Sequence, residues 1–139
     1  MNHKDTKADV LSRKPLGVEV EQAAHAVIGG AIEVHSKVGP GFLESVYEEA
    51  MAIELAARRI PFKRQAAFGL EYKGQRIGEG RMDLLVNDCL VVELKAVDDL
   101  APIHFAQAIS YLRATGHRLA LLINFNVPIL KQGIRRVVL

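Results

Sequence analysis

The strongest constraint on the fold is the stretch RMDLLVNDCLVVELKA, residues 81–96. Two apolar-rich runs flank Asn87 and Asp88, a pair of residues typical of tight turns, so the stretch predicts a β-hairpin. Residues two apart on a strand face the same side, and Glu93 and Lys95 therefore project together from the second run. Their apolar neighbours belong to the core. One face of this strand thus carries a carboxylate and an amine.

Asp83 begins the first run and joins that face only if it stands opposite Glu93. This pairing requires an odd number of loop residues, most simply Asn87, Asp88 and Cys89. A two-residue turn without a bulge would place Asp83 on the other face. We therefore predict a three-residue loop.

Apolar periodicity elsewhere predicts helices around this hairpin. The helices extend from 18 to about 37, from about 43 to 59, and from 102 to just before Gly116. Extended segments broken by Lys73-Gly74 and by Gly78 and Gly80 precede the hairpin, and residues 119–125 and 133–139 predict a buried strand and an edge strand. The predicted class is α+β: a mixed β-sheet flanked by helices, in the order helix, helix, three or four strands, helix, strand, strand.

Length and composition limit the possible classes of protein. With 139 residues and 50% hydrophobic content, the chain predicts a flexible polar tail over residues 1–16 and one domain over residues 17–139. The single cysteine excludes a disulfide framework and a cysteine-rich zinc site. No apolar run is long enough to span a bilayer, so we expect a cytoplasmic protein without a membrane partner. A formal charge of +2 is too slight to identify a nucleic-acid binder.

The second predicted helix carries a glutamate inside its apolar arc. On a helical wheel the arc contains Leu43, Val46, Tyr47, Ala50, Met51, Ile53, Leu55 and Ala57. Glu44 falls between Met51 and Leu55 in projection, where a carboxylate is costly unless paired, hydrogen-bonded or bound to a cation. The alternative is a first-turn glutamate that caps the helix or meets its positive dipole end. Glu54, also inside the arc, is expected to pair with a basic neighbour.

Asp83, Glu93 and Lys95 on one sheet face suit a hard cation. Mg²⁺ takes oxygen ligands and needs only one or two protein carboxylates, with water and phosphate oxygens completing its octahedron. The lysine would then orient an attacking water or stabilise charge in the transition state. A cross-strand salt bridge at the surface is the simpler alternative.

The helix that follows the hairpin presents a polar face. His104, Gln107 and Tyr111 have the spacing i, i+3, i+7 and therefore lie close together on the helix surface. Glutamine and tyrosine can both hydrogen-bond phosphate oxygens or an attacking water. A polar face on a surface helix is common, so this signal alone is weak.

In combination these residues resemble a known pattern. Asp83, the triplet Glu93-Leu94-Lys95 and the pair Gln107 and Tyr111 are similar to the PD-(D/E)xK nuclease pattern, with the glutamine–tyrosine element of its RecB-like branch. More closely, the chain resembles the GxxExxY family, whose motif is matched by Gly41, Glu44 and Tyr47. The stretches VGPGFLESVYEEA, RMDLLVNDCLVVELKA, FAQAISYLRATG and LLINFNVPILKQGIRR follow that family's pattern from about residue 20 onward.

The resemblance implies a Mg²⁺-dependent nuclease, with Mn²⁺ as an alternative ion and DNA as the expected nucleic acid. It implies that Asp83 and Glu93 hold the metal with help from the Leu94 carbonyl, that Glu44 is an additional acidic ligand, and that Lys95 acts on the attacking water. Gln107 and Tyr111 would border the site. The superfamily's proline is missing, because Met82 precedes Asp83.

Two other classes of function stay open at this stage. The same core could serve as a non-catalytic module that binds nucleic acid or a protein partner, because the short chain leaves little room for a separate recognition domain. A purely structural domain with surface ion pairs is the third hypothesis. A homodimer would suit a small nuclease that cuts two strands, but no residue pattern indicates one.

Overall fold

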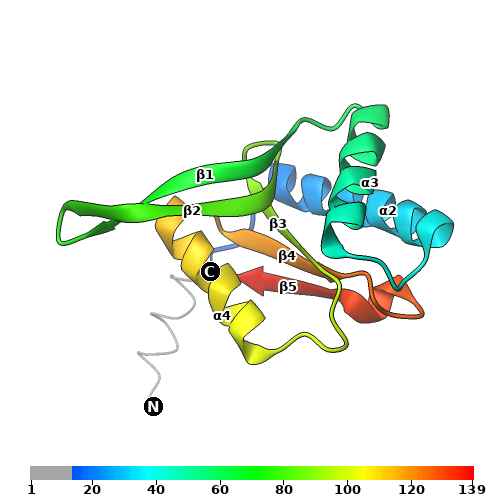
Figure 1. Cartoon of the computed structure of the whole chain (residues 1–139). Coiled ribbons are helices and arrows are strands. Elements are labelled where there is room, and N and C mark those ends of the chain that lie inside the picture. Colours follow the sequence, from blue (N-terminus) through cyan, green and yellow to red (C-terminus); the bar gives the residue numbers. More distant parts are fainter. Residues whose placement is uncertain (1–13) are drawn as a thin grey trace, which may run out of the picture.

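The computed structural model describes residues 14–139, which form one mixed five-stranded sheet with helices on both faces (Figure 1). The strands are β1 (Phe62–Tyr72), β2 (Gln75–Val86), β3 (Leu90–Lys95), β4 (Leu119–Asn124) and β5 (Ile134–Val138). They lie side by side in sequence order. Only the β3–β4 pair is parallel, because helix α4 (Pro102–Thr115) connects those two strands as a crossover. The predicted α+β class is confirmed, with three strands before α4.

Each face of the sheet has its own hydrophobic core. Helices α2 (Val18–Val38) and α3 (Glu44–Ala57) cover one face, and their buried residues meet Leu84, Val92 and Leu121 in the first core. Helix α4 covers the opposite face, where the second core contains Ala108 and Leu122. Successive strand residues alternate between the two cores, so β3 and β4 read as nearly continuous apolar runs.

The β2–β3 hairpin has the predicted three-residue loop. Val86 pairs with Leu90, which leaves residues 87–89 as the loop. Asn87 and Asp88 take positive φ values of 53° and 54°, a conformation that asparagine and aspartate tolerate better than most residues. The odd loop length places Asp83 opposite Glu93, as the sequence predicted.

Helix α3 is shorter and less buried than its apolar arc predicts. It spans Glu44–Ala57, and only Tyr47, Met51 and Leu55 are buried. Leu43 and Ile53 are more than two-thirds exposed, because only the side of the helix that faces α2 and the sheet is covered. Glu54 forms the expected ion pair with a basic neighbour, here Arg58 at 2.6 Å.

Two further expectations need correction or restriction. Gly78 and Gly80 lie inside β2 and do not break it; at Gly80 an added Cβ would sit 2.4 Å from the Phe68 ring, so glycine lets that ring pack across the ladder. The predicted tail lies mostly outside the described residues. Of its last three residues, Leu16 already packs against the first core. None of the helices among residues 14–139 is both long and apolar enough to cross a membrane.

Candidate functional site

The candidate site lies where β2 and β3 separate. Their last backbone pair is Leu84 with Val92; beyond it β2 continues beside β1 alone, while β3 continues beside β4. Figure 1 shows the β1–β2 ribbon leaving the rest of the sheet. Asp83 and Glu93 are the first residues past that last pair, and we call them the acid pair. The strand divergence therefore opens the sheet at the two predicted carboxylates.

The acid pair replaces the backbone ladder at this point. The Asp83 amide donates to Glu93 Oε2 at 2.8 Å, and the Leu94 amide donates to Asp83 Oδ2 at 2.8 Å. Each carboxylate thus satisfies a backbone donor that the neighbouring strand would otherwise pair. The Asp83 amide on β2 therefore holds the Glu93 side chain, and the Leu94 amide on β3 holds the Asp83 side chain.

Burial makes the acid pair electrostatically costly. Glu93 is 3% exposed. Its burial, followed by the charge of Asp83, raises the pKa of Glu93 to about 8, although the Asp83 amide and Lys95 oppose the shift. Burial also raises the pKa of Asp83 against the hydrogen bond from Leu94. A bound cation would offset this electrostatic cost, so the desolvation and mutual repulsion of the two carboxylates make the acid pair a candidate metal site.

Lys95 and Glu44 lie near enough to the acid pair to act on its titration. The charge of Lys95 lowers the pKa values of Asp83, Glu93 and Glu44. Partial desolvation of the Glu44 carboxyl raises its pKa first, and the charge of Asp83 raises it further. The structure therefore brings Glu44 from α3 toward the residues from β2 and β3.

The turn before α3 fixes where the helix begins, and Glu44 is its first residue. Gly41 has φ of 101°, which favours glycine, and helix α3 begins at Glu44. The buried Tyr47 hydroxyl donates to the Gly39 carbonyl at 2.7 Å and accepts from the Phe42 amide at 3.2 Å, which ties the turn to the helix. The side chain of the N-cap residue Leu43 makes no cap hydrogen bond, and the exposed Glu44 lies in the first turn, where its charge also meets the positive end of the helix dipole.

Helix α4 brings one of its two predicted site residues close to the acids. The pKa of Tyr111 is raised by burial and then by the charges of Glu93 and Asp83, which places the phenol near the acid pair. Gln107 is half-buried one turn earlier, and within residues 14–139 it makes no hydrogen bond to the acids. His104 has a structural role: its Nδ1 accepts from the Ala101 amide at 2.9 Å and caps the helix.

The donor atoms of the acid pair fit a hard cation. Asp83 Oδ2 and Glu93 Oε2 accept from backbone amides. The other oxygens, Glu93 Oε1 and Asp83 Oδ1, hold no backbone amide and suit a hard cation, although Asp83 Oδ1 also lies 3.5 Å from Gln65 Nε2. Among residues 14–139 no group of three or more His, Cys, Asp or Glu side chains is already arranged around one metal position. Glu44 therefore lies near the acid pair without forming a preassembled three-carboxylate cluster with it.

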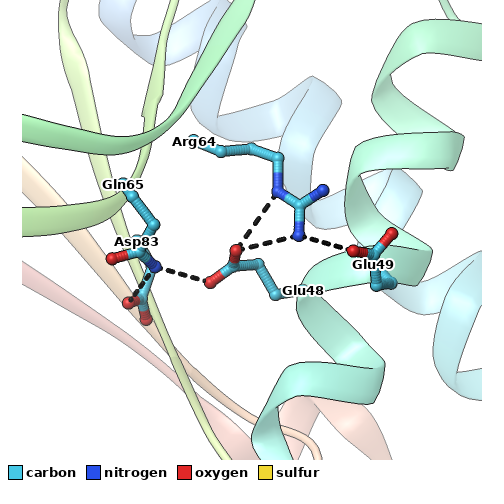
Figure 2. A network of polar contacts seen from close by, with 5 residues as sticks. All are labelled: Glu48, Glu49, Arg64, Gln65 and Asp83. Carbon is cyan, nitrogen blue, oxygen red and sulfur yellow. Dashed lines mark hydrogen bonds and ion pairs between the residues drawn. The ribbon is translucent and has the colours of Figure 1, made fainter.

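Sequence reasoning missed a polar network that touches Asp83. Arg64 Nη2 donates to Glu48 Oε2 at 3.0 Å and to Glu49 Oε1 at 2.9 Å. Gln65 Nε2 donates to Glu48 Oε1 at 2.8 Å and contacts Asp83 Oδ1 at 3.5 Å (Figure 2). Glu48 stands one helical turn after Glu44, and that i, i+4 spacing was the available signal.

Asn124 is a second residue that the sequence did not single out. It is 2% exposed, and its side-chain amide donates to the Val97 carbonyl at 2.8 Å and accepts from the Val97 amide at 3.0 Å. Asn124 pairs with Lys95 across the β3–β4 ladder. It thus anchors the chain that leaves the site after Lys95.

Comparison with known proteins found one family model that matches the chain. A family model described as the PD-(D/E)XK nuclease superfamily matches residues 21–137. The matched range includes α3, α4, strands β1 to β4 and all of β5 except its last residue. It also includes each of the candidate site residues. Comparison with curated proteins and with solved structures found no match.

Proposed function

Because the chain belongs to the PD-(D/E)XK nuclease superfamily, we propose that it is a Mg²⁺-dependent nuclease that hydrolyses phosphodiester bonds of DNA. The observation that carries the proposal is the fork in the sheet, where the buried carboxylate of Glu93, the half-buried carboxylate of Asp83 and a lysine lie at the end of an otherwise apolar strand pair. Two desolvated carboxyl groups with raised pKa values are costly for a structural role alone.

Within the superfamily we assign the chain to the GxxExxY family and to the RecB-like branch. The motif residues support this assignment through their roles in the fold: Gly41 permits the turn, the Tyr47 hydroxyl fixes it, and Glu44 lies near enough for the charge of Asp83 to raise its pKa. On α4, the glutamine–tyrosine element has its tyrosine near the acid pair.

In the proposed mechanism each chain residue has a defined task. Asp83 and Glu93 would hold the ion together with the Leu94 carbonyl, and Glu44 would add negative charge close by and act on the ion through water. A bound Mg²⁺ would supply Lewis-acid activation of the phosphate and of the attacking water. Mn²⁺, which accepts the same oxygen donors, is expected to substitute.

The remaining residues act on the substrate and on protons. Lys95 carries a positive charge on the same strand face as Glu93, so it can orient the attacking water and stabilise the charge that builds on the phosphate oxygens. The phenol of Tyr111 and the amide of Gln107 border the site from α4 and can donate hydrogen bonds to the nucleic-acid backbone. Glu93 must lose its proton before it can bind a cation.

The direct test compares the wild type with Lys95→Ala on linear, nicked, single-stranded and branched DNA, and on RNA, with and without Mg²⁺ or Mn²⁺. We expect metal-dependent cleavage of DNA by the wild type and a loss of at least a hundredfold in the variant. Lys131→Ala, at an exposed lysine of the 3₁₀ helix Leu130–Gly133, is the matched control and should cleave like the wild type.

The outcomes separate the candidate functions. Cleavage that does not differ between the wild type and Lys95→Ala would indicate a contaminating nuclease and contradict the proposal. DNA binding without cleavage and without Mg²⁺ binding in calorimetry would favour a non-catalytic binding module. Faster cleavage of RNA than of DNA would correct the substrate and leave the reaction type unchanged.

A further inference from the structure

Gln65 adopts an unusual backbone conformation directly opposite Asp83. The β1–β2 ladder pairs Arg64 with Leu84 and Ala66 with Met82, which places Gln65 across from Asp83. Its φ is 48°, in the left-handed region that a non-glycine residue rarely adopts within a strand. The register is the same on both sides of this residue, so no inserted residue accounts for the conformation.

The left-handed residue coincides with a turn of the β1–β2 ribbon. Phe62 packs on the first core, whereas Ala66, four residues later, packs on the second. In a regular strand both side chains would face the same side. The partner strand behaves likewise, because Leu84 belongs to the first core and Met82 to the second. The ribbon therefore changes faces at the position of Gln65 and Asp83.

The Gln65 side chain links two carboxylates that would otherwise repel each other. Its amide nitrogen donates to Glu48 Oε1 at 2.8 Å and contacts Asp83 Oδ1 at 3.5 Å. Because one nitrogen atom contacts both carboxylates, the two acids lie near each other. An amide NH₂ is the neutral group that can donate to both at once.

Glu48 is itself fixed by an arginine. Two nitrogens of Arg64 donate to Glu48 Oε2, at 3.2 Å and 3.0 Å, and the Glu48 side chain is only 16% exposed. The chain of contacts therefore extends from Arg64 on β1 through Glu48 on α3 and Gln65 to Asp83 on β2 (Figure 2). It reaches the one Asp83 oxygen that the Leu94 amide does not hold.

We propose that Gln65 is a positioning residue for the metal-binding carboxylate of Asp83, held in place by Glu48 and Arg64. This inference rests on the proposed function. Gln65 keeps Oδ1 of Asp83 directed to the site and prevents Glu48 from displacing it. The strained backbone brings the amide into reach of both carboxylates, and such strain persists where the surrounding structure imposes it.

Gln65→Gly separates this positioning role from a purely structural one. Glycine adopts a φ of 48° without strain, so the variant should melt at or above the wild-type temperature. Its Mg²⁺ half-saturation for cleavage should rise about tenfold, with the rate at saturating Mg²⁺ changed less than about threefold. Mn²⁺ binding, followed by electron paramagnetic resonance without DNA, should weaken by the same factor.

Lys73→Gly is the matched control. Lys73 has a φ of 50° at the tip of the β1–β2 hairpin and takes no part in the acid site, so glycine should relieve the same strain there. It should leave Mg²⁺ half-saturation and Mn²⁺ binding at wild-type values. Gln65→Asn provides a second variant: asparagine tolerates this backbone conformation, but its shorter amide cannot span both carboxylates, so it should behave like Gln65→Gly.

Three results would overturn the inference. If Gln65→Gly and Gln65→Asn bind Mn²⁺ as tightly as the wild type, Gln65 does not position Asp83, and the proposed function stands. If Lys73→Gly weakens metal binding equally, strain relief rather than the side chain is responsible. If the wild type itself neither binds Mn²⁺ nor cleaves DNA, the proposed function fails together with the inference.

Discussion

The two ends of the β2–β3 hairpin are built from the same strands but on different principles. At the closed end, Leu84–Val86 pair with Leu90–Val92 through a regular backbone ladder, and their side chains fill both cores. At the open end, Asp83 and Glu93–Lys95 lie where the strands separate, and carboxylates take the place of the ladder. The backbone ladder ends at Leu84 and Val92, and the carboxylates begin at the next residues, Asp83 and Glu93.

The difference indicates how the molecule separates stability from chemistry. The closed end buries apolar surface and satisfies its backbone groups, so it contributes to folding. The open end buries charge, which costs folding free energy and is compatible with binding a cation. Because the strands are continuous, the stable closed end can hold the acid pair in a fixed geometry.

The largest expected effect is on catalysis at the open end. Asp83→Asn removes a charge, yet the asparagine Oδ1 can still accept from the Leu94 amide, so the fold should remain. Cleavage should fall on the order of a thousandfold, equivalent to about 4 kcal/mol in the barrier. Single-turnover cleavage and circular dichroism would measure both. Loss of structure in the variant would show that the open end also stabilises the fold, and the contrast between the two ends would then not hold.

The closed end should show the opposite behaviour. Leu90 is fully buried beside the hairpin loop, so Leu90→Ala should lower the free energy of unfolding by roughly 3.5 kcal/mol. Ile77→Ala, on the neighbouring strand β2 and 64% exposed, is the control and should cost less than about 1 kcal/mol. Denaturant titration measures both changes. The Mg²⁺ half-saturation of the folded Leu90→Ala protein should equal that of the wild type; a large shift would mean that the two ends are coupled.

The closed end and the acid pair were predictable because both follow from residue parity. Alternating side chains put Glu93 and Lys95 on one face, and the requirement that Asp83 stand opposite Glu93 predicted an odd-length loop, which the structure confirms. The order of helices and strands followed from apolar periodicity in the same way. Local sequence is sufficient for such features because they depend on a few consecutive residues.

The contacts between elements were not predictable from local pattern. Helical periodicity placed Leu43 and Ile53 on the apolar arc of α3, but which part of that arc is covered depends on how the helix docks. The contact of Gln65 with Glu48 joins residues on different elements and requires a left-handed backbone that no composition rule indicates for glutamine. The role of the Tyr47 hydroxyl in the turn before α3 likewise appears only in three dimensions.

The pH dependence of stability tests the cost of the open end. The pKa of Glu93 rises from 4.5 when unfolded to about 8 when folded, so its contribution to stability is fully present below pH 4.5 and is lost as pH rises toward 8. Glu93→Gln removes this titration while its amide oxygen can still accept from Asp83. Between pH 4.5 and 7, in a chelator, the wild type should lose about 3 kcal/mol relative to the variant.

Denaturant unfolding at several pH values measures that difference, and Mg²⁺ provides the control. The ion binds the ionised carboxyl, so saturating Mg²⁺ should reduce the gap at pH 7 and leave it unchanged at pH 4.5. Equal pH dependence in the wild type and Glu93→Gln would mean that the acid pair is solvated as ordinary surface residues are. The open end would then carry no electrostatic cost, and its contrast with the closed end would disappear.

The smallest expected effect concerns Tyr47 on α3, which contacts the first core and also holds the turn before Glu44. Its ring is buried in the first core and stacks on Phe125 at 4.5 Å, while its hydroxyl fastens the turn that precedes Glu44. Tyr47→Phe keeps the ring, so stability should fall by only about 1 kcal/mol, the typical cost of the lost hydrogen bonds. Cleavage should fall by no more than about threefold, because Glu44 loses some of its orientation while the acid pair stays fixed. Tyr72→Phe, at a 61% exposed ring, should change neither quantity. A hundredfold loss of cleavage in Tyr47→Phe would place Glu44 among the groups that bind the metal directly, since a carboxylate that acts only through water tolerates a small shift of its helix.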